Sequence, residues 1–125
     1  MTVNKINLPA RLSARPTPPL PTSIHEESVA QLADLFHLLG DPTRLRIVLA
    51  CASAAPIAVG DIAATLDLSS SLVSHHLRLL RAARIVKAER QGKQVFYSTA
   101  DAHISGVLRD MLEHIAEPST PGNDV

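Results

Sequence analysis

Two histidines and two acidic residues near the end of this chain are arranged almost symmetrically about one point. The two histidines, His103 and His114, are centred close to residue 109, and so are the two acidic residues, Asp101 and Glu117. Two imidazoles and two carboxylates make a four-ligand set that suits tetrahedral zinc, and imidazole also suits cobalt and nickel. The four side chains are therefore candidate metal ligands.

A single helix cannot wrap these side chains around one ion. His103 and His114 lie about 16 Å apart along a helix axis, although eleven residues at about 100° each return them to one face. If a second copy of the helix packs antiparallel about a two-fold axis near Arg109, His114 of one chain falls opposite His103 of the other, and Glu117 falls opposite Asp101. The spacing therefore predicts two equivalent sites shared between subunits. Scattered polar residues on a solvated helix are the alternative.

The composition favours a helical protein with one core. The 125 residues include no tryptophan and only 2% aromatic residues, and a core built from Ala, Leu, Ile and Val favours helices over a sandwich or barrel. The single cysteine, Cys51, excludes an intrachain disulfide, and we interpret it as a buried structural thiol. No signal sequence opens the chain, and no apolar run is long enough to span a bilayer. We therefore expect a cytoplasmic protein without membrane contact.

Proline content divides the chain into an arm, one domain and a tail. Five of the nine prolines lie between residues 9 and 21, and such a segment sustains neither a helix nor a central strand. We expect a disordered, proline-rich arm over residues 1–22. A single DNA-binding and dimerisation domain is expected over residues 23–118, followed by a flexible tail over 119–125.

Caps and apolar spacing predict a mainly α domain with a small β-hairpin. A capping box at Ser23 opens the first helix, and Asp41 caps a second helix that turns Leu45, Val48 and Leu49 inward. Two short helices then follow around a tight turn, which is the arrangement of a helix-turn-helix. The alternating pattern of residues 85–98 predicts a two-stranded hairpin with a basic tip. The expected helices cover about residues 23–39, 42–53, 59–66, 70–82 and 101–117.

A net charge of zero conceals a basic block. Residues 69–97 carry six Lys or Arg against one acidic residue, whereas residues 98–125 carry one against five. A basic stripe is the electrostatic footprint of phosphate binding, although a solvated basic face is the alternative. Because the block coincides with the helix-turn-helix and the hairpin, we expect double-stranded DNA to be the partner.

The second helix of a helix-turn-helix enters the major groove by its N-terminal residues. Ser69 is interpreted as the cap of this helix, and Ser70 as either a cap or a base contact. The candidates for base contacts are Ser70, Ser71, Ser74 and His75. The candidates for phosphate contacts and for the hairpin tip are Arg78, Arg81, Lys87, Arg90, Gln91 and Lys93.

Four stretches resemble the ArsR/SmtB metal-sensing repressors over about residues 25–118. They are Leu39-Gly-Asp-Pro-Thr-Arg-Leu-Arg-Ile47, Val73-Ser-His-His-Leu-Arg-Leu-Leu80 with Arg84-Ile-Val86, the tip Arg90-Gln-Gly-Lys93, and the pattern D-x-H-x10-H-x2-E from residue 101. The resemblance implies a winged helix-turn-helix homodimer formed through its first and last helices. It also implies repression from a palindromic operator, which the protein leaves when metal binds between the two last helices.

The resemblance assigns further roles to single residues. The last-helix pattern is similar to the zinc-sensing branch, with nickel or cobalt sensing as the alternative. His114 would also act as a relay, donating its second N–H to the carbonyl of Arg84. Ala58 stands where thiolate-sensing members carry a cysteine, so sensing through thiolates is not expected.

Two other functions remain open on the residues alone. A hydrolytic metal centre keeps an open coordination position, whereas four protein ligands close it, so we expect no enzyme activity and no small-molecule substrate. A metal-insensitive winged-helix regulator, whose last helix serves dimerisation only, is the other alternative.

Overall fold

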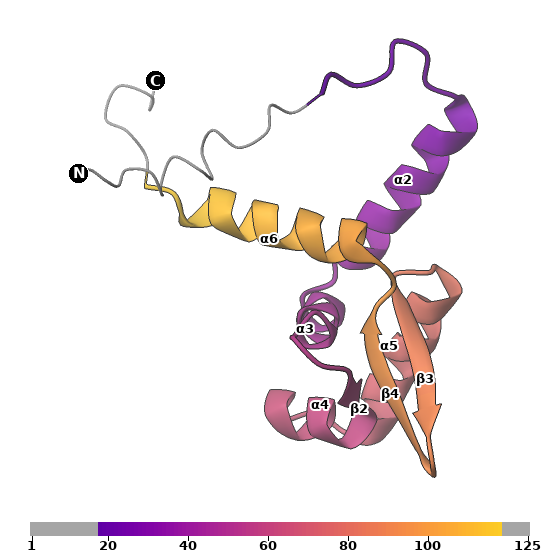
Figure 1. Cartoon of the computed structure of the whole chain (residues 1–125), viewed down its shortest axis with the longest axis vertical. Helices are drawn as coiled ribbons and strands as arrows, with labels where there is room; N and C mark the ends of the chain where they lie inside the picture. Colours follow the sequence, from indigo (N-terminus) through magenta and orange to yellow (C-terminus); the bar gives the residue numbers. More distant parts are fainter. Residues whose placement is uncertain (1–17, 119–125) are drawn as a thin grey trace, which may run out of the picture. The chain divides into compact units, whose positions relative to one another are not determined.

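The computed structural model describes residues 18–118 (Figure 1). The described residues divide into two units between Gln31 and Leu32, and the second unit contains the core. Most of the predicted arm and all of the predicted tail lie outside the described residues. The elements are α2 (Glu26–Leu39), α3 (Pro42–Cys51), β2 (Ile57–Ala58), α4 (Val59–Leu66), α5 (Ser70–Ala82), β3 (Val86–Gln91), β4 (Gln94–Thr99) and α6 (Ala102–Ala116).

The ends of the first two helices differ from the prediction. The capping box at Ser23 is wrong, because α2 begins at Glu26 and its first helical bond runs from the Val29 N–H to the His25 carbonyl. The surrounding side chains are exposed, so no packing offsets the cost of an additional turn. The predicted second helix also stops early, at Cys51, where the Ser53 hydroxyl donates to the Ala50 carbonyl at 2.9 Å.

The buried face of α3 is only partly as predicted. Val48 is fully buried, but Leu45 and Leu49 are half-buried, and Ile47 and Cys51 occupy the core instead. The N-terminal signal is confirmed, since the Asp41 carboxylate accepts the Arg44 N–H at 2.8 Å and Pro42 follows it. Local capping therefore fixes where α3 starts, and packing fixes its rotation.

The helix-turn-helix has the predicted boundaries. The turn between α4 and α5 is made by Asp67 in the left-handed region at φ 57°, with the Leu68 N–H bonded to the Ala63 carbonyl at 2.9 Å. Ser69 caps α5, as predicted, by accepting the Leu72 N–H at 3.1 Å. The first residues of α5 are thereby held at a defined helix start.

The predicted two-stranded hairpin is confirmed, and a short strand that was not predicted extends it to a three-stranded sheet. β3 and β4 pair antiparallel up to Gln91 and Gln94, and Gly92 turns the chain at φ 65°. β2 adds to the other edge of β4, in the order β2-β4-β3, with Ile57 opposite Tyr97. β2 has only two residues, which is too short for an alternating pattern in the sequence. It is a strand because it pairs with the free edge of β4.

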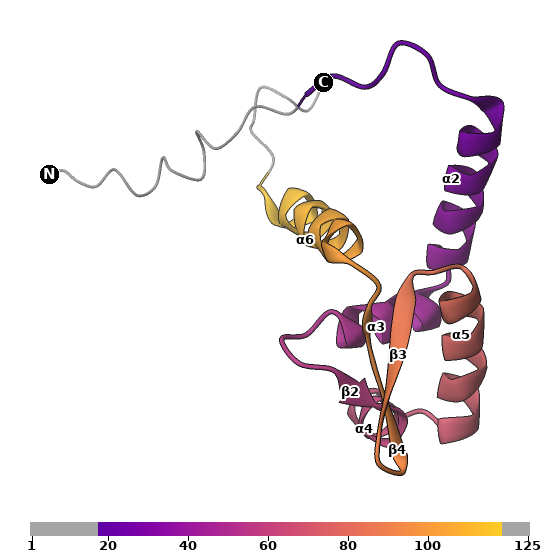
Figure 2. The ribbon, with the colours of Figure 1, turned by 45° about the vertical axis from the view of Figure 1, so that its right-hand side comes forward.

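The core lies where α3, α4 and α5 meet the sheet, and Figure 2 shows these helices gathered beside the hairpin. α6 reaches this core through Ile104 and Leu108, which are half-buried. None of the helices in residues 18–118 is long and apolar enough to cross a membrane. The fully buried side chains are Ile47, Val48, Cys51, Ile62, Val73, Leu77, Leu80, Ile85 and Val86.

Candidate metal centre and nucleic-acid interface

The first pair of candidate ligands is brought together at the start of α6. Asp101 is the N-cap, and its Oδ1 accepts the N–H groups of His103 at 3.0 Å and Ile104 at 3.1 Å. These bonds, the one from Ile104 first, lower the pKa of Asp101, so the carboxylate is held charged and oriented. Its Oδ2 takes no part in either bond and can serve as a ligand atom.

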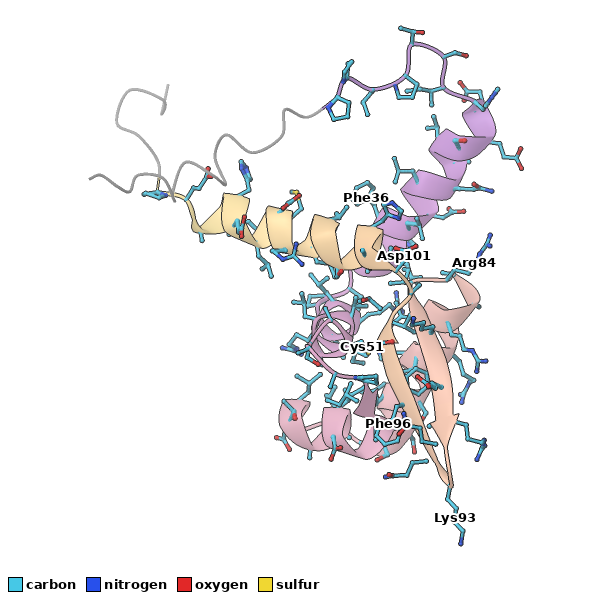
Figure 3. The ribbon with its side chains drawn as sticks, viewed as in Figure 1. Phe36, Cys51, Arg84, Lys93, Phe96 and Asp101 are labelled. Atoms are coloured by element: carbon cyan, nitrogen blue, oxygen red, sulfur yellow. The ribbon has the colours of Figure 1, made fainter. Side chains whose placement is uncertain are left out.

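The His103 imidazole lies beside this carboxylate, with its Nδ1 3.6 Å from the Asp101 Oδ1. The side chains of His103 and Asp101 are 94% and 56% exposed, respectively. One nitrogen donor and one oxygen donor therefore face solvent together, where a second pair from another chain can reach them. Figure 3 shows Asp101 where β4 leads into α6.

The second pair lies at the opposite end of α6. His114 is in the last turn, and Glu117 follows the helix as its C-cap, with the Glu117 N–H donating to the His114 carbonyl at 3.3 Å. Both residues are exposed. Within residues 18–118 of one chain, no three His, Cys, Asp or Glu side chains lie close enough to hold a metal ion. One chain thus presents two incomplete ligand pairs, as the length of the helix requires.

Apolar side chains remain exposed on α6 and on the second half of α2. Phe36 is 62% exposed and Ile115 is 74% exposed. Leu32 and Phe36 of α2 line one pocket with Val107 of α6, and exposed apolar side chains of this kind often mark an interaction site. Leu32, Phe36, Val107, Met111, Leu112 and Ile115 form this surface, which we call the apolar face.

The candidate base contacts lie on the first two turns of α5. Ser70, Ser71 and His75 are exposed, and Ser74 is half-buried. Since the Ser69 hydroxyl already serves as the cap, the hydroxyl of Ser70 is not needed for that purpose. These side chains are short and polar, and they are anchored by a regular helix, which suits them to contacts with base edges.

The candidate phosphate contacts continue from α5 into the hairpin. Lys93 projects from its tip (Figure 3), and the Arg90 guanidinium lies against that tip through a 3.5 Å bond to the Gly92 carbonyl. Arg84, between α5 and β3, is exposed and takes the left-handed conformation at φ 61°. The exposed side chains of this surface are Arg78, Arg81, Lys87, Arg90, Gln91 and Lys93.

Sequence reasoning missed one polar residue of α5. His76 is only 9% exposed, and its Nδ1 accepts a hydrogen bond from the Arg44 Nε at 3.3 Å. Burial first, and then the positive charge of Arg44, lower the pKa of this imidazole. The sequence does indicate this burial, because His76 falls in the apolar spacing of Val73, Leu77 and Leu80.

Cys51 is buried, as predicted, with 1% of its surface exposed. Burial raises the pKa of its thiol to about 12. At neutral pH the group is therefore a thiol, which is neither a good nucleophile nor a good metal ligand. The candidate metal ligands are therefore the two histidines of α6 and the two carboxylates that cap it.

Comparisons with known proteins agree with this geometry. Residues 39–89 match a family model described as a helix-turn-helix domain. The chain is 42% identical over 91 residues to the transcriptional repressor SmtB homolog of Synechocystis, covering 73% of this chain and 68% of that protein. It is 31% identical over 113 residues to the cadmium resistance transcriptional regulatory protein CadC homolog of Staphylococcus aureus, covering 81% and 93%.

A solved structure with the same fold is the homodimeric winged helix-turn-helix DNA-binding domain Mb0332 of Mycobacterium bovis. The TM-score is 0.59 at 23% identity, covering 79% of this chain and 100% of that one. The predicted winged helix-turn-helix fold is therefore confirmed, with β3 and β4 as the wing.

Proposed function

Because this chain belongs to the ArsR/SmtB family of metal-sensing transcriptional regulators, we propose that it is a repressor released from its operator by zinc. It is a DNA-binding regulator and not an enzyme. In this proposal the homodimer binds a palindromic operator, and metal binds at the dimer interface. The observation that carries the zinc site is the solvent-facing pair of Asp101 and His103 at one end of α6, with His114 and Glu117 at the other.

The apolar face supports a dimer through α2 and α6. Two α6 helices that pack antiparallel would cover Val107, Met111 and Leu112, which are about half exposed in one chain. The same arrangement brings His114 and Glu117 of the partner subunit to Asp101 and His103. Each dimer then has two sites of identical composition, and the metal supplies a rigid link between the subunits.

The donor set fits zinc. Two neutral imidazoles and two carboxylates fill a tetrahedral shell, and the low pKa of Asp101 keeps one of these carboxylates charged. The same donors also accept cobalt and nickel. Nickel or cobalt sensing is therefore the alternative within the same fold, and a metal-insensitive regulator is the alternative without a site.

Metal can release DNA only if it favours a dimer conformation that fits the operator poorly. Reversing a 1:99 equilibrium needs roughly a 10⁴-fold preference for one conformation. We propose that His114 donates its second N–H to the Arg84 carbonyl when it binds metal, because ligating histidines usually donate this N–H to a carbonyl or a carboxylate. Arg84 lies in the left-handed conformation directly after α5, which is the recognition helix in this proposal. This bond would therefore couple α6 to α5.

The decisive experiment measures operator affinity with and without metal. Metal-free protein first selects a duplex from a random-sequence library at pH 7.5, and the selected duplex is used as the operator. The affinity of the protein for this duplex is then measured at increasing concentrations of zinc, cobalt or nickel. Calorimetry gives the number of metal ions that bind to each dimer. We expect zinc to weaken binding and to bind at two ions per dimer. Tight binding that no metal changes would favour the metal-insensitive regulator.

The wing assignment predicts a change in salt dependence. Lys93→Ala removes an exposed cation at the hairpin tip, so the slope of log affinity against log salt should flatten by about one unit. The loss should be similar for operator and random duplexes, because phosphates carry no sequence information. Arg46→Ala is the control, since it removes an exposed cation of α3 that lies outside the basic block. An unchanged slope in Lys93→Ala would show that the wing does not contact DNA.

A further inference from the structure

His76 is the one buried polar side chain in residues 18–118. It lies on the inner face of the recognition helix, between the core residues Val73 and Leu80, while its neighbour His75 is exposed. Buried polar groups are almost always hydrogen-bonded, because an unpaired one loses its water without compensation. The hydrogen-bond partner of His76 therefore fixes the orientation of α5 on the core.

That partner, Arg44, ties three elements together. Its Nε donates to the His76 Nδ1 at 3.3 Å, and its Nη1 donates to the Leu38 carbonyl at 3.0 Å. Its backbone N–H is held by the Asp41 cap. One guanidinium thus connects the last turn of α2, the first turn of α3 and the middle of α5.

We propose that Arg44 and His76 are positioning residues for operator binding, and that protonation of His76 in acid releases the operator. The proposal rests on the proposed recognition role of α5. Apolar contacts are non-directional, so Val73, Leu77 and Leu80 alone tolerate small rotations of the helix, whereas a hydrogen bond fixes one orientation. Any rotation about the helix axis also moves Ser74 and His75, which precede His76 directly.

The bond exists only while His76 is neutral. Arg44 is always charged and can only donate, so the His76 Nδ1 must carry a lone pair. A proton there would remove the acceptor and place two positive charges side by side. Among the described residues, Arg44 and His75 disfavour the charged imidazole and the Asp41 carboxylate favours it, while burial is the largest cause of its lowered pKa.

The direction of the pH effect follows from this lowered pKa. The unfolded chain takes up a proton at its ordinary pKa near 6.5, before the folded protein does. The stability that neutral His76 contributes is therefore complete above about pH 6.5 and is lost as the pH falls toward the lower, folded-state pKa. Operator affinity should instead be lost as the pH falls through the lowered pKa of His76 in the folded, DNA-free protein, because that is where the folded protein takes up the proton.

The test compares binding to the selected duplex at pH 7.5 and 5.5 without metal, in the presence of a chelator. The parent protein should bind about tenfold more weakly at pH 5.5, which is within the range usual for coupled sites. His76→Asn places its Oδ1 at the position of the His76 Nδ1, so it keeps an acceptor for Arg44 that cannot titrate. It should bind normally at pH 7.5 and lose most of this acid response. His37→Asn is the matched control that should keep the acid response, because it removes another histidine that lines a hollow with Arg44 and leaves the bond between Arg44 and His76 in place.

A second measurement uses the unmodified protein, so its result does not depend on whether a variant folds. If protonation opposes DNA binding, the bound duplex must lower the pKa of His76 further, by linkage. An NMR titration of the His76 ring with and without duplex measures this shift. An unchanged pKa, or a His76→Asn protein with the full acid response, would overturn the proposal. Absence of any binding at pH 7.5 would instead refute the DNA-binding function on which it rests.

Discussion

Replacing His114 by alanine should leave a dimer that binds its operator normally and no longer responds to zinc. His114 lies in the last turn of α6, outside the basic block that contacts DNA in our proposal, so its loss spares binding. It removes one nitrogen ligand from each site and also the donor to the Arg84 carbonyl. Coupling between two sites is typically about 1 to 3 kcal/mol, or roughly 5- to 150-fold in affinity, and this whole factor should disappear.

The measurement is operator affinity of the His114→Ala protein with and without saturating zinc. Glu113→Ala is the matched control, because it changes the adjacent exposed residue of the same turn and is not a candidate ligand. His103→Ala should also abolish the response, since it removes the other imidazole. If zinc weakened operator binding by His114→Ala as strongly as it does for the parent, α6 would have no place in the mechanism.

A charge in the apolar face should have a still broader effect. Met111→Asp places a carboxylate at a position that is 53% exposed in one chain and buried between α6 helices in the proposed dimer. An unpaired buried charge is costly enough to separate the subunits. Two linked DNA-binding domains bind about 10²- to 10⁴-fold more tightly than one, so operator affinity should fall by at least about 100-fold when the dimer separates. Both metal sites should be lost with the dimer.

Analytical ultracentrifugation gives the oligomeric state, and the duplex and zinc titrations are repeated on the same sample. Leu20→Glu is the control, because it introduces a charge at an exposed apolar position outside every helix and strand. A Met111→Asp protein that remained a dimer with normal operator affinity would place the subunit interface elsewhere.

The amino-acid sequence by itself determined the helix-turn-helix and the ligand pattern. Both ends of α5 were predicted correctly, because Ser69 caps locally and the apolar period stops at the last turn. The symmetric spacing of Asp101, His103, His114 and Glu117 was equally visible, since it needs only the rise and turn of one helix. These features depend on interactions within a few residues of the chain, which the order of the residues records directly.

Only the tertiary structure decided which polar side chain entered the core and how the sheet was completed. His76 is buried because Arg44, 32 residues earlier, provides its hydrogen bond. β2 is a strand because the edge of β4 lies beside Ile57. The late start of α2 likewise reflects packing, since the predicted cap at Ser23 had no neighbours to stabilise its turn. Each depends on what lies nearby in space, and that is settled only when distant segments pack together.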